Sequence, residues 1–154
     1  MSLKDKLKSD LTESIRNRDE LKSSTIRMIL TSITNEEVSG KEARTLTDAE
    51  TVTVLTREAK KRREAAEAFE QGGAKDRAER ERAEGHVIAT YLPSQLNEEE
   101  LASLIKEAIS STGASGLQGL GLVMKFLQPK VAGRADGAKV SAAVKEALST
   151  QSLK

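Results

Sequence analysis

The sequence predicts an all-α protein, in which a four-helix N-terminal part is followed by a compact three-helix domain. Apolar residues recur at helical spacing along the chain, and no segment alternates apolar and polar residues as a strand does. Two prolines and several glycines divide this pattern into segments of helix length. We therefore expect one domain at residues 1–92 and a second at residues 97–154, joined by a linker that begins at Pro93.

Four amphipathic segments make up the N-terminal part. We expect its helices at 2–18, at 20–38, from Thr47 to Gly72, and from there to Leu92. Thr47 and Glu50 form a capping box, in which each side chain satisfies a free backbone N–H group of the helix start. Pro93 disfavours helical geometry at the residue before it, so the fourth helix should stop there.

Three further helices are expected after the linker. They should run from Asn97 to about residue 112, from 117 to 128, and from Asp136 to the end of the chain. Asn97 and Glu100 make a second capping box, and Asp136 is placed to cap the last helix. Pro129 should follow the end of the middle helix, because proline inside a helix removes a hydrogen bond.

The charge of the chain is nearly balanced, with 25 basic and 24 acidic residues. This balance argues against a polycation that binds nucleic acid by its bulk field. The distribution is uneven, however, because residues 98–112 carry a net charge of −3 and the stretch after Gly113 carries +4. The chain has only three aromatic residues, too few for a platform on which RNA bases stack.

The composition also restricts the compartment and the chemistry. The chain has no cysteine, which excludes disulfides, thiolate nucleophiles and cysteine-based metal sites, and favours a reducing compartment. Apolar runs are far shorter than the ~20 residues of a membrane-spanning helix, and the N-terminus lacks the apolar core of a signal peptide. We therefore expect a cytoplasmic protein with no membrane partner.

No residue pattern points to catalysis. His86 is the only histidine, and no carboxylate pair stands out as a general acid and base. The chain has neither a phosphate-cradling glycine loop nor an H-E-x-x-H motif. We expect no catalytic residue, no metal site and no cofactor, so that the chain is not an enzyme on its own.

Basic residues near the C-terminus are the candidate binding site. The predicted RNA-binding residues are Lys125, Lys130, Arg134 and Lys139, of which Lys130 and Arg134 are expected to be exposed. The alternative interpretation is that these residues are ordinary solvated charge. The run from Lys60 to Arg63 is interleaved with acids, and pairs such as Glu58–Arg62 stabilise a helix by ~0.2–0.5 kcal/mol each. We therefore interpret this run as a solvated helix face.

Several motifs together resemble the GatB/YqeY family over essentially the whole chain. They are Tyr91-Leu92-Pro93-Ser94-Gln95-Leu96 with Glu99-Glu100-Leu101, then Gly121-Leu122-Val123-Met124, then Gly133-Arg134-Ala135-Asp136-Gly137 with Val140. In the N-terminal half, the resemblance to the stand-alone YqeY-like members rests on Arg27-Met28, on Lys60-Lys61-Arg62-Arg63, and on Asp76 and Glu84. The resemblance implies that residues 97–150 are similar to the tail domain of the B subunit of the tRNA-dependent amidotransferase, which helps to hold tRNA.

The chain departs from the family pattern at two places. Gly119 and Leu122 stand where the resemblance implies an acidic and a basic residue, and the ATP-using domain of the amidotransferase is absent. The leading hypothesis is a non-catalytic module that binds tRNA or a tRNA-handling complex through the basic C-terminal stretch. One alternative is a protein-interaction adaptor that uses its third and fourth helices and binds no RNA. Another is an accessory part of a glutamine-dependent amidotransferase, a carbon–nitrogen ligase, which acts only with partner subunits.

Overall fold

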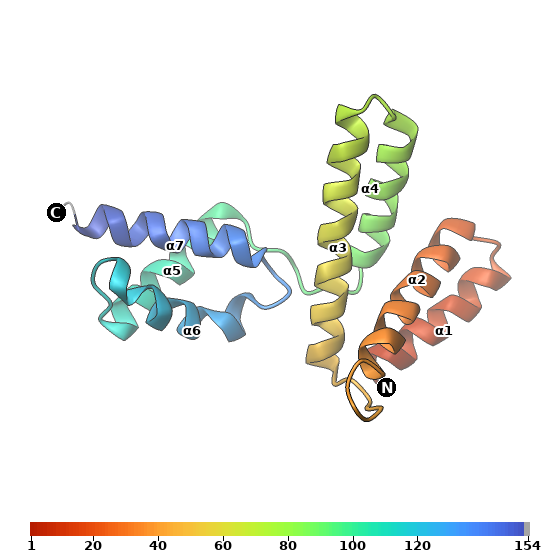
Figure 1. The fold of residues 1–154 in the computed structure, drawn as a ribbon, viewed down its shortest axis with the longest axis horizontal. Helices are drawn as coiled ribbons and strands as arrows, with labels where there is room; N and C mark the ends of the chain where they lie inside the picture. Colours follow the sequence, from red (N-terminus) through yellow and green to blue (C-terminus); the bar gives the residue numbers. More distant parts are fainter. Residues whose placement is uncertain (153–154) are drawn as a thin grey trace. The chain divides into compact units, whose positions relative to one another are not determined.

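The computed structural model describes residues 1–152 and contains seven α-helices and one short 3₁₀ helix (Figure 1). No strand is present in this part of the chain, which confirms the prediction of an all-α fold. Residues 153–154, which include the Lys154 counted in the basic stretch, lie outside the described residues. The chain divides into two compact units, Met1–Leu92 and Pro93–Lys154.

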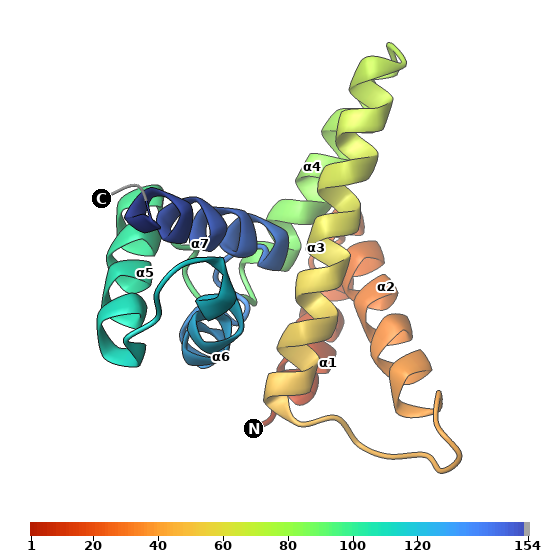
Figure 2. The same cartoon turned by 60° about the vertical axis from the view of Figure 1, so that its left-hand side comes forward.

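The first unit consists of four helices in two antiparallel pairs. Its helices are α1 (Leu3–Arg16), α2 (Glu20–Glu37), α3 (Asp48–Gln71) and α4 (Lys75–Ala89). The hairpin of α3 and α4 extends well beyond the pair of α1 and α2, so that its turn at Gly72 stands clear of the rest of the unit (Figures 1 and 2). The helix α4 ends three residues earlier than expected, because the chain tightens into a turn in which Tyr91 N–H donates to the carbonyl of Ile88 at 3.0 Å.

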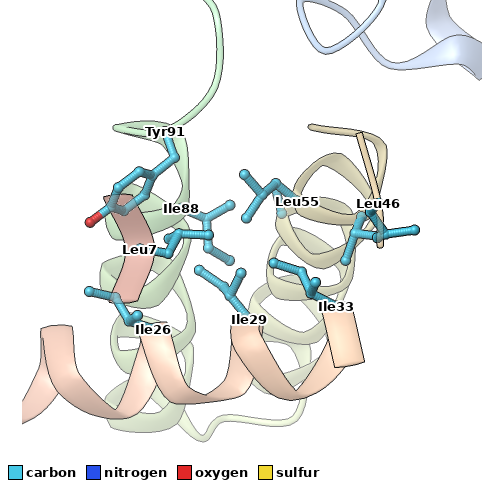
Figure 3. Packing of buried hydrophobic residues seen from close by; sticks show 10 residues of the cluster. Leu7, Ile26, Ile29, Ile33, Leu46, Leu55, Ile88 and Tyr91 are labelled. Atoms are coloured by element: carbon cyan, nitrogen blue, oxygen red, sulfur yellow. The ribbon is translucent and has the colours of Figure 1, made fainter. Parts of the chain in front are cut away.

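The core of the first unit lies where all four helices meet (Figure 3). Its largest fully buried side chains are Leu7 from α1, Ile26, Ile29 and Ile33 from α2, Leu55 from α3 and Ile88 from α4. Burying each such side chain contributes roughly 1.5–3 kcal/mol relative to leaving it in water. Tyr91 closes one end of this core, and its hydroxyl donates a hydrogen bond to Asp10 Oδ2 at 2.5 Å.

A buried ionic cluster joins α2, α3 and α4. Glu58 is buried on α3 and accepts a hydrogen bond from Ser32 of α2 at 3.0 Å. Arg62 lies one turn further along α3, 4.0 Å from Glu58, as the i,i+4 spacing indicated. Its guanidinium group also pairs with Glu81 and Glu84 of α4, at 3.3 Å each. One arginine therefore neutralises carboxylates from two helices.

The second unit is a three-helix bundle with a 3₁₀ turn. Its elements are α5 (Glu98–Thr112), the 3₁₀ helix η1 (Leu117–Gly119), α6 (Leu120–Val131) and α7 (Gly137–Ser152). The expected capping boxes at Thr47 and Asn97 are both formed. The expectation that the middle helix ends before Pro129 is wrong, since α6 continues through Pro129 to Val131. Pro129 is tolerated because it lies exposed in the last turn, where the carbonyl it leaves without a partner can reach water.

The apolar faces of the three helices enclose the core of the second unit. The fully buried side chains are Val123 and Leu127 of α6 and Val140, Val144 and Leu148 of α7, packed against Leu101, Ile105 and Ala108 of α5. Each set repeats every three or four residues, so the stripe read from the sequence faces the interior in every helix. This packing fixes which side chains of α5, α6 and α7 remain on the surface.

Candidate functional site

The two sequence motifs of the second unit meet in space and lock together. Leu96 N–H donates to the carbonyl oxygen of Arg134 at 2.9 Å. Gln95 Nε2 donates to the carbonyl of Gly133 at 2.8 Å, and Arg134 Nε donates to the carbonyl of Ser94 at 3.0 Å. These three hydrogen bonds, which we call the linker clamp, hold residues 94–96 against the turn between α6 and α7. The linker segment after Pro93 is therefore part of the folded second unit.

The turn in the linker clamp has a fixed local geometry. Gly133 has φ +74°, a left-handed conformation that side chains disfavour, and this reverses the chain after α6. Asp136 then caps α7, because its Oδ1 accepts the N–H group of Ala138 at 3.1 Å, as the sequence indicated. The glycine and the aspartate of this motif thus have structural tasks, and Arg134 adds a further hydrogen bond to the linker.

Two of the four candidate RNA-binding residues are engaged within the protein. Lys130 Nζ pairs with Glu107 Oε1 of α5 at 3.2 Å and lies 4.7 Å from the centre of the Phe126 ring. Arg134 belongs to the linker clamp. The expectation that both side chains are fully exposed is wrong, because both are partly buried by these contacts. Sequence position alone did not reveal these partners, which lie 23 and 40 residues away.

The other two candidates lie on the surface at separate places. Lys125 is exposed on the side of α6 that faces away from the buried Val123 and Leu127. Lys139 is exposed on α7 and borders a groove between α5 and α7. On α5, Glu107, the partner of Lys130, points about 170° away from that groove, given about 100° of rotation per residue. The structure therefore puts Lys130 and Lys139 on different sides of α5 and does not gather the four cations into one patch.

A groove with a volume of about 780 Å³ lies between α5 and α7 in the second unit. Apolar side chains from both helices line it: Leu101, Ala102, Ile105 and Ile109 of α5, and Ala143 and Ala147 of α7. Two acidic and two basic residues border it, namely Glu98, Lys106, Lys139 and Glu146. The groove was not predicted from the sequence. The apolar arc of α5 extends from Leu104 through Ile105 to Ala102, and this arc is wider than one neighbouring helix can cover.

The structure explains one departure from the family pattern. Gly119 is buried at the start of α6, and a Cβ atom there would lie 2.7 Å from the Cβ of Ala114. An acidic side chain could enter this position only if the backbone moved. Leu122, the second departure, is 59% exposed, so a leucine replaces the basic residue on an open surface.

Three side chains with shifted pKa values, Glu37, Glu50 and Tyr91, stabilise the fold of the first unit. Lys4 and the N–H group of Leu46 both donate to Glu37 and lower the pKa of its carboxyl group. The pKa of Glu50 is lowered by its hydrogen bonds to the cap of α3 and to Arg44. Burial and the neighbouring Asp10 raise the pKa of Tyr91 above its ordinary value. Each of these groups stabilises a helix end or a junction between helices.

Neither a metal centre nor a membrane span is found in the described part of the chain. No three histidine or carboxylate side chains converge there in a way that could hold a metal ion. Among residues 1–152, no helix combines the length and the apolar character that crossing a membrane requires. His86, the single histidine, is exposed near the end of α4.

The fold and these surfaces define a two-unit, all-helical protein whose second unit is a three-helix bundle held to its linker by the linker clamp. The chain belongs to the family of YqeY-like proteins, whose family model matches residues 4–148. A search of curated proteins finds none that matches this chain.

Proposed function

We propose that this YqeY-like protein is a non-catalytic, tRNA-associated helical module of the cytoplasm. The observation that carries the proposal is the linker clamp, because it joins the two motifs that resemble the amidotransferase tail into one folded element. In that resemblance the tail helps to hold tRNA, while the chemistry takes place in other domains. Function is inferred here from a site and a family together, since fold alone does not establish it.

Two exposed lysines in the second unit support the proposed binding of tRNA phosphates. Lys125 and Lys139 are exposed on α6 and α7, whereas Lys130 and Arg134 are half-buried. From Pro93 to Gln151, six basic residues are matched by six acidic residues, so attraction to a polyanion must come from local contacts. Each phosphate contact on a duplex lowers the log–log salt slope by ~0.9, so two contacts give a slope of about −2. If all four candidates contribute, the slope reaches about −3 to −4.

Binding of mixed tRNA, measured by fluorescence anisotropy at low salt, tests the proposal. The double change Lys125→Glu with Lys139→Glu should weaken binding at least tenfold without changing the helical circular dichroism signal. The matched control is Lys60→Glu with Arg63→Glu, which alters the net charge equally but lies on α3. Absence of binding at low salt, or an equal loss in both double variants, would contradict the RNA proposal.

A protein-interaction adaptor is the second candidate. The observation that favours it is the length of the α3–α4 hairpin, which extends beyond the pair of α1 and α2 (Figure 2). Both helices of the hairpin carry charged residues of both signs. An adaptor of this kind would bind a protein partner through the hairpin and leave tRNA unbound. The control variant at Lys60 and Arg63 would then disrupt the complex that the C-terminal variant leaves intact.

An accessory role in a glutamine-dependent amidotransferase is the third candidate, and it rests on the family resemblance. On this account the chain contributes binding of tRNA, and partner subunits contribute glutamine hydrolysis and the use of ATP. The purified chain alone should hydrolyse neither glutamine nor ATP. Turnover that survives purification and is abolished by a point substitution in this chain would contradict the non-catalytic assignment.

A further inference from the structure

The apolar surface of α5 is wider than its two neighbours cover. With about 100° of rotation per residue, the apolar residues of α5 extend over an arc of about 160°, from Leu104 to Ala102. One edge of this arc packs in the core, where Ala108 is fully buried. The other edge, with Ala102 exposed and Ile109 half-buried, faces the groove beside α7. A bundle of three helices therefore leaves a stripe on α5 that a further helix would cover.

The groove has the size and the floor that a helix requires. Its lining on α5 runs from Glu98 to Ile109, a length of ~16 Å at 1.5 Å per residue, or about three helical turns. The side chains at its centre are small where α7 contributes Ala143 and Ala147. Small residues let a neighbouring helix approach closely, and an amphipathic helix with apolar residues at i, i+3, i+4 and i+7 fits such a groove.

The charges at the edge restrict the partner further. Each of the two helices brings one acid and one base to the groove, Glu98 and Lys106 from α5, and Lys139 and Glu146 from α7. A polyanion such as tRNA would meet two carboxylates there, and a purely basic or purely acidic peptide would meet two like charges. Only a helix that carries both acidic and basic residues beside its apolar stripe can form ion pairs with all four of these charged side chains.

We propose that the groove between α5 and α7 is a docking site for an amphipathic helix of about three turns, supplied by a protein partner, with acidic and basic residues flanking its apolar face. The helix would lie on Ala102 and Ile109 and complete a four-helix arrangement around α5. This site lies apart from Lys125 and from the linker clamp but shares Lys139 with the proposed tRNA contacts, so a docked helix and tRNA would compete for Lys139.

The experiment uses the full chain and a synthetic helical peptide as the probe. The peptide carries leucine at i, i+3, i+4, i+7 and i+11 with alternating glutamate and lysine on its flanks, and a second peptide keeps the leucines with glutamate alone on the flanks. Binding is measured by fluorescence anisotropy and mapped by amide chemical shifts. We expect the mixed-charge peptide to bind at least tenfold more tightly than the glutamate peptide and to shift amides of α5 and α7.

Matched variants distinguish this groove from other apolar surface. Ala102→Gln with Ala143→Gln fills the groove without changing its charge and should weaken binding at least tenfold. Leu122→Gln removes an exposed leucine outside the groove and should leave the affinity unchanged. The proposal is overturned if the peptide fails to bind, if its amide shifts lie outside α5 and α7, or if Leu122→Gln matters as much as the groove variant. Melting curves of each variant exclude a loss of fold as the cause, and binding of tRNA by the groove variant should be retained.

Discussion

The contact between Gly119 and Ala114 makes Gly119→Ala a demanding test of the packing in the second unit. The added methyl carbon would lie 2.7 Å from the Ala114 Cβ and 3.3 Å from its Cα, whereas carbon atoms pack best about 3.5–4.0 Å apart. Ala114 is buried and has no rotamer by which its methyl group could move away. Overpacking of this kind costs about 1–3 kcal/mol. For a unit of this size that unfolds cooperatively, each kcal/mol lowers Tm by roughly 4–8 °C.

Gly121→Ala is the matched control two residues further on. A Cβ at Gly121 would meet no atom within 4 Å, and this glycine lies in the first turn of α6. Alanine at a compatible position stabilises a protein by about 0.4–1 kcal/mol, chiefly because the unfolded chain loses fewer conformations on folding. Urea denaturation followed by circular dichroism compares the two variants. If Gly119→Ala is as stable as Gly121→Ala, the packing described around Ala114 is wrong.

Three further outcomes follow from contacts in the structure. Arg62→Met should destabilise the first unit by about 2–4 kcal/mol in thermal melts, because it removes the cation shared by Glu58, Glu81 and Glu84. Glu58 then keeps Lys61 and Glu84 keeps Arg80, both at 3.3 Å. Arg82→Met, which breaks an exposed pair, should cost under ~1 kcal/mol. Glu37 has a lowered pKa in the folded state, so the stability it contributes is present above the ordinary value of 4.5 and is lost as pH falls below it. Glu37→Gln should therefore weaken the fall in the free energy of unfolding at acidic pH. An unchanged pH dependence would count against this role of Glu37. Brief proteolysis should cut at the exposed turn of Gly72 and Gly73 before it cuts residues 94–96. Arg134→Ala removes one of the three hydrogen bonds of the linker clamp and should speed cleavage at residues 94–96 relative to cleavage at that turn.

The sequence predicted the local features of this fold well, because their signals are local. The capping boxes at Thr47 and Asn97 place a helix start within one residue, since a cap depends on side chains three positions apart. The exception, Pro129, shows the limit of that reasoning. Proline disfavours a helix interior, but its free-energy cost is smaller in the last turn of a helix, where water can replace the lost backbone hydrogen bond.

The surroundings of the candidate site could not be predicted from the sequence in the same way. Whether Lys130 is free or paired depends on Glu107, and the contact exists only because α5 packs beside α6. The groove likewise results from how α7 crosses α5. A charge count along the chain reports that residues after Gly113 are basic, but it does not report that they face several directions. The assignment of individual RNA-binding residues therefore stays a prediction.

Amide chemical shifts of the protein can show directly whether and where tRNA binds. Isotope-labelled full-length chain is titrated with mixed tRNA at low salt, and the titration is repeated at higher salt. We expect amide shifts around Lys125 and Lys139 in the second unit, and these shifts should disappear as salt competes for the phosphates. Spectra that do not change at low salt, or shifts confined to the α3–α4 hairpin, would contradict the tRNA assignment and favour the adaptor.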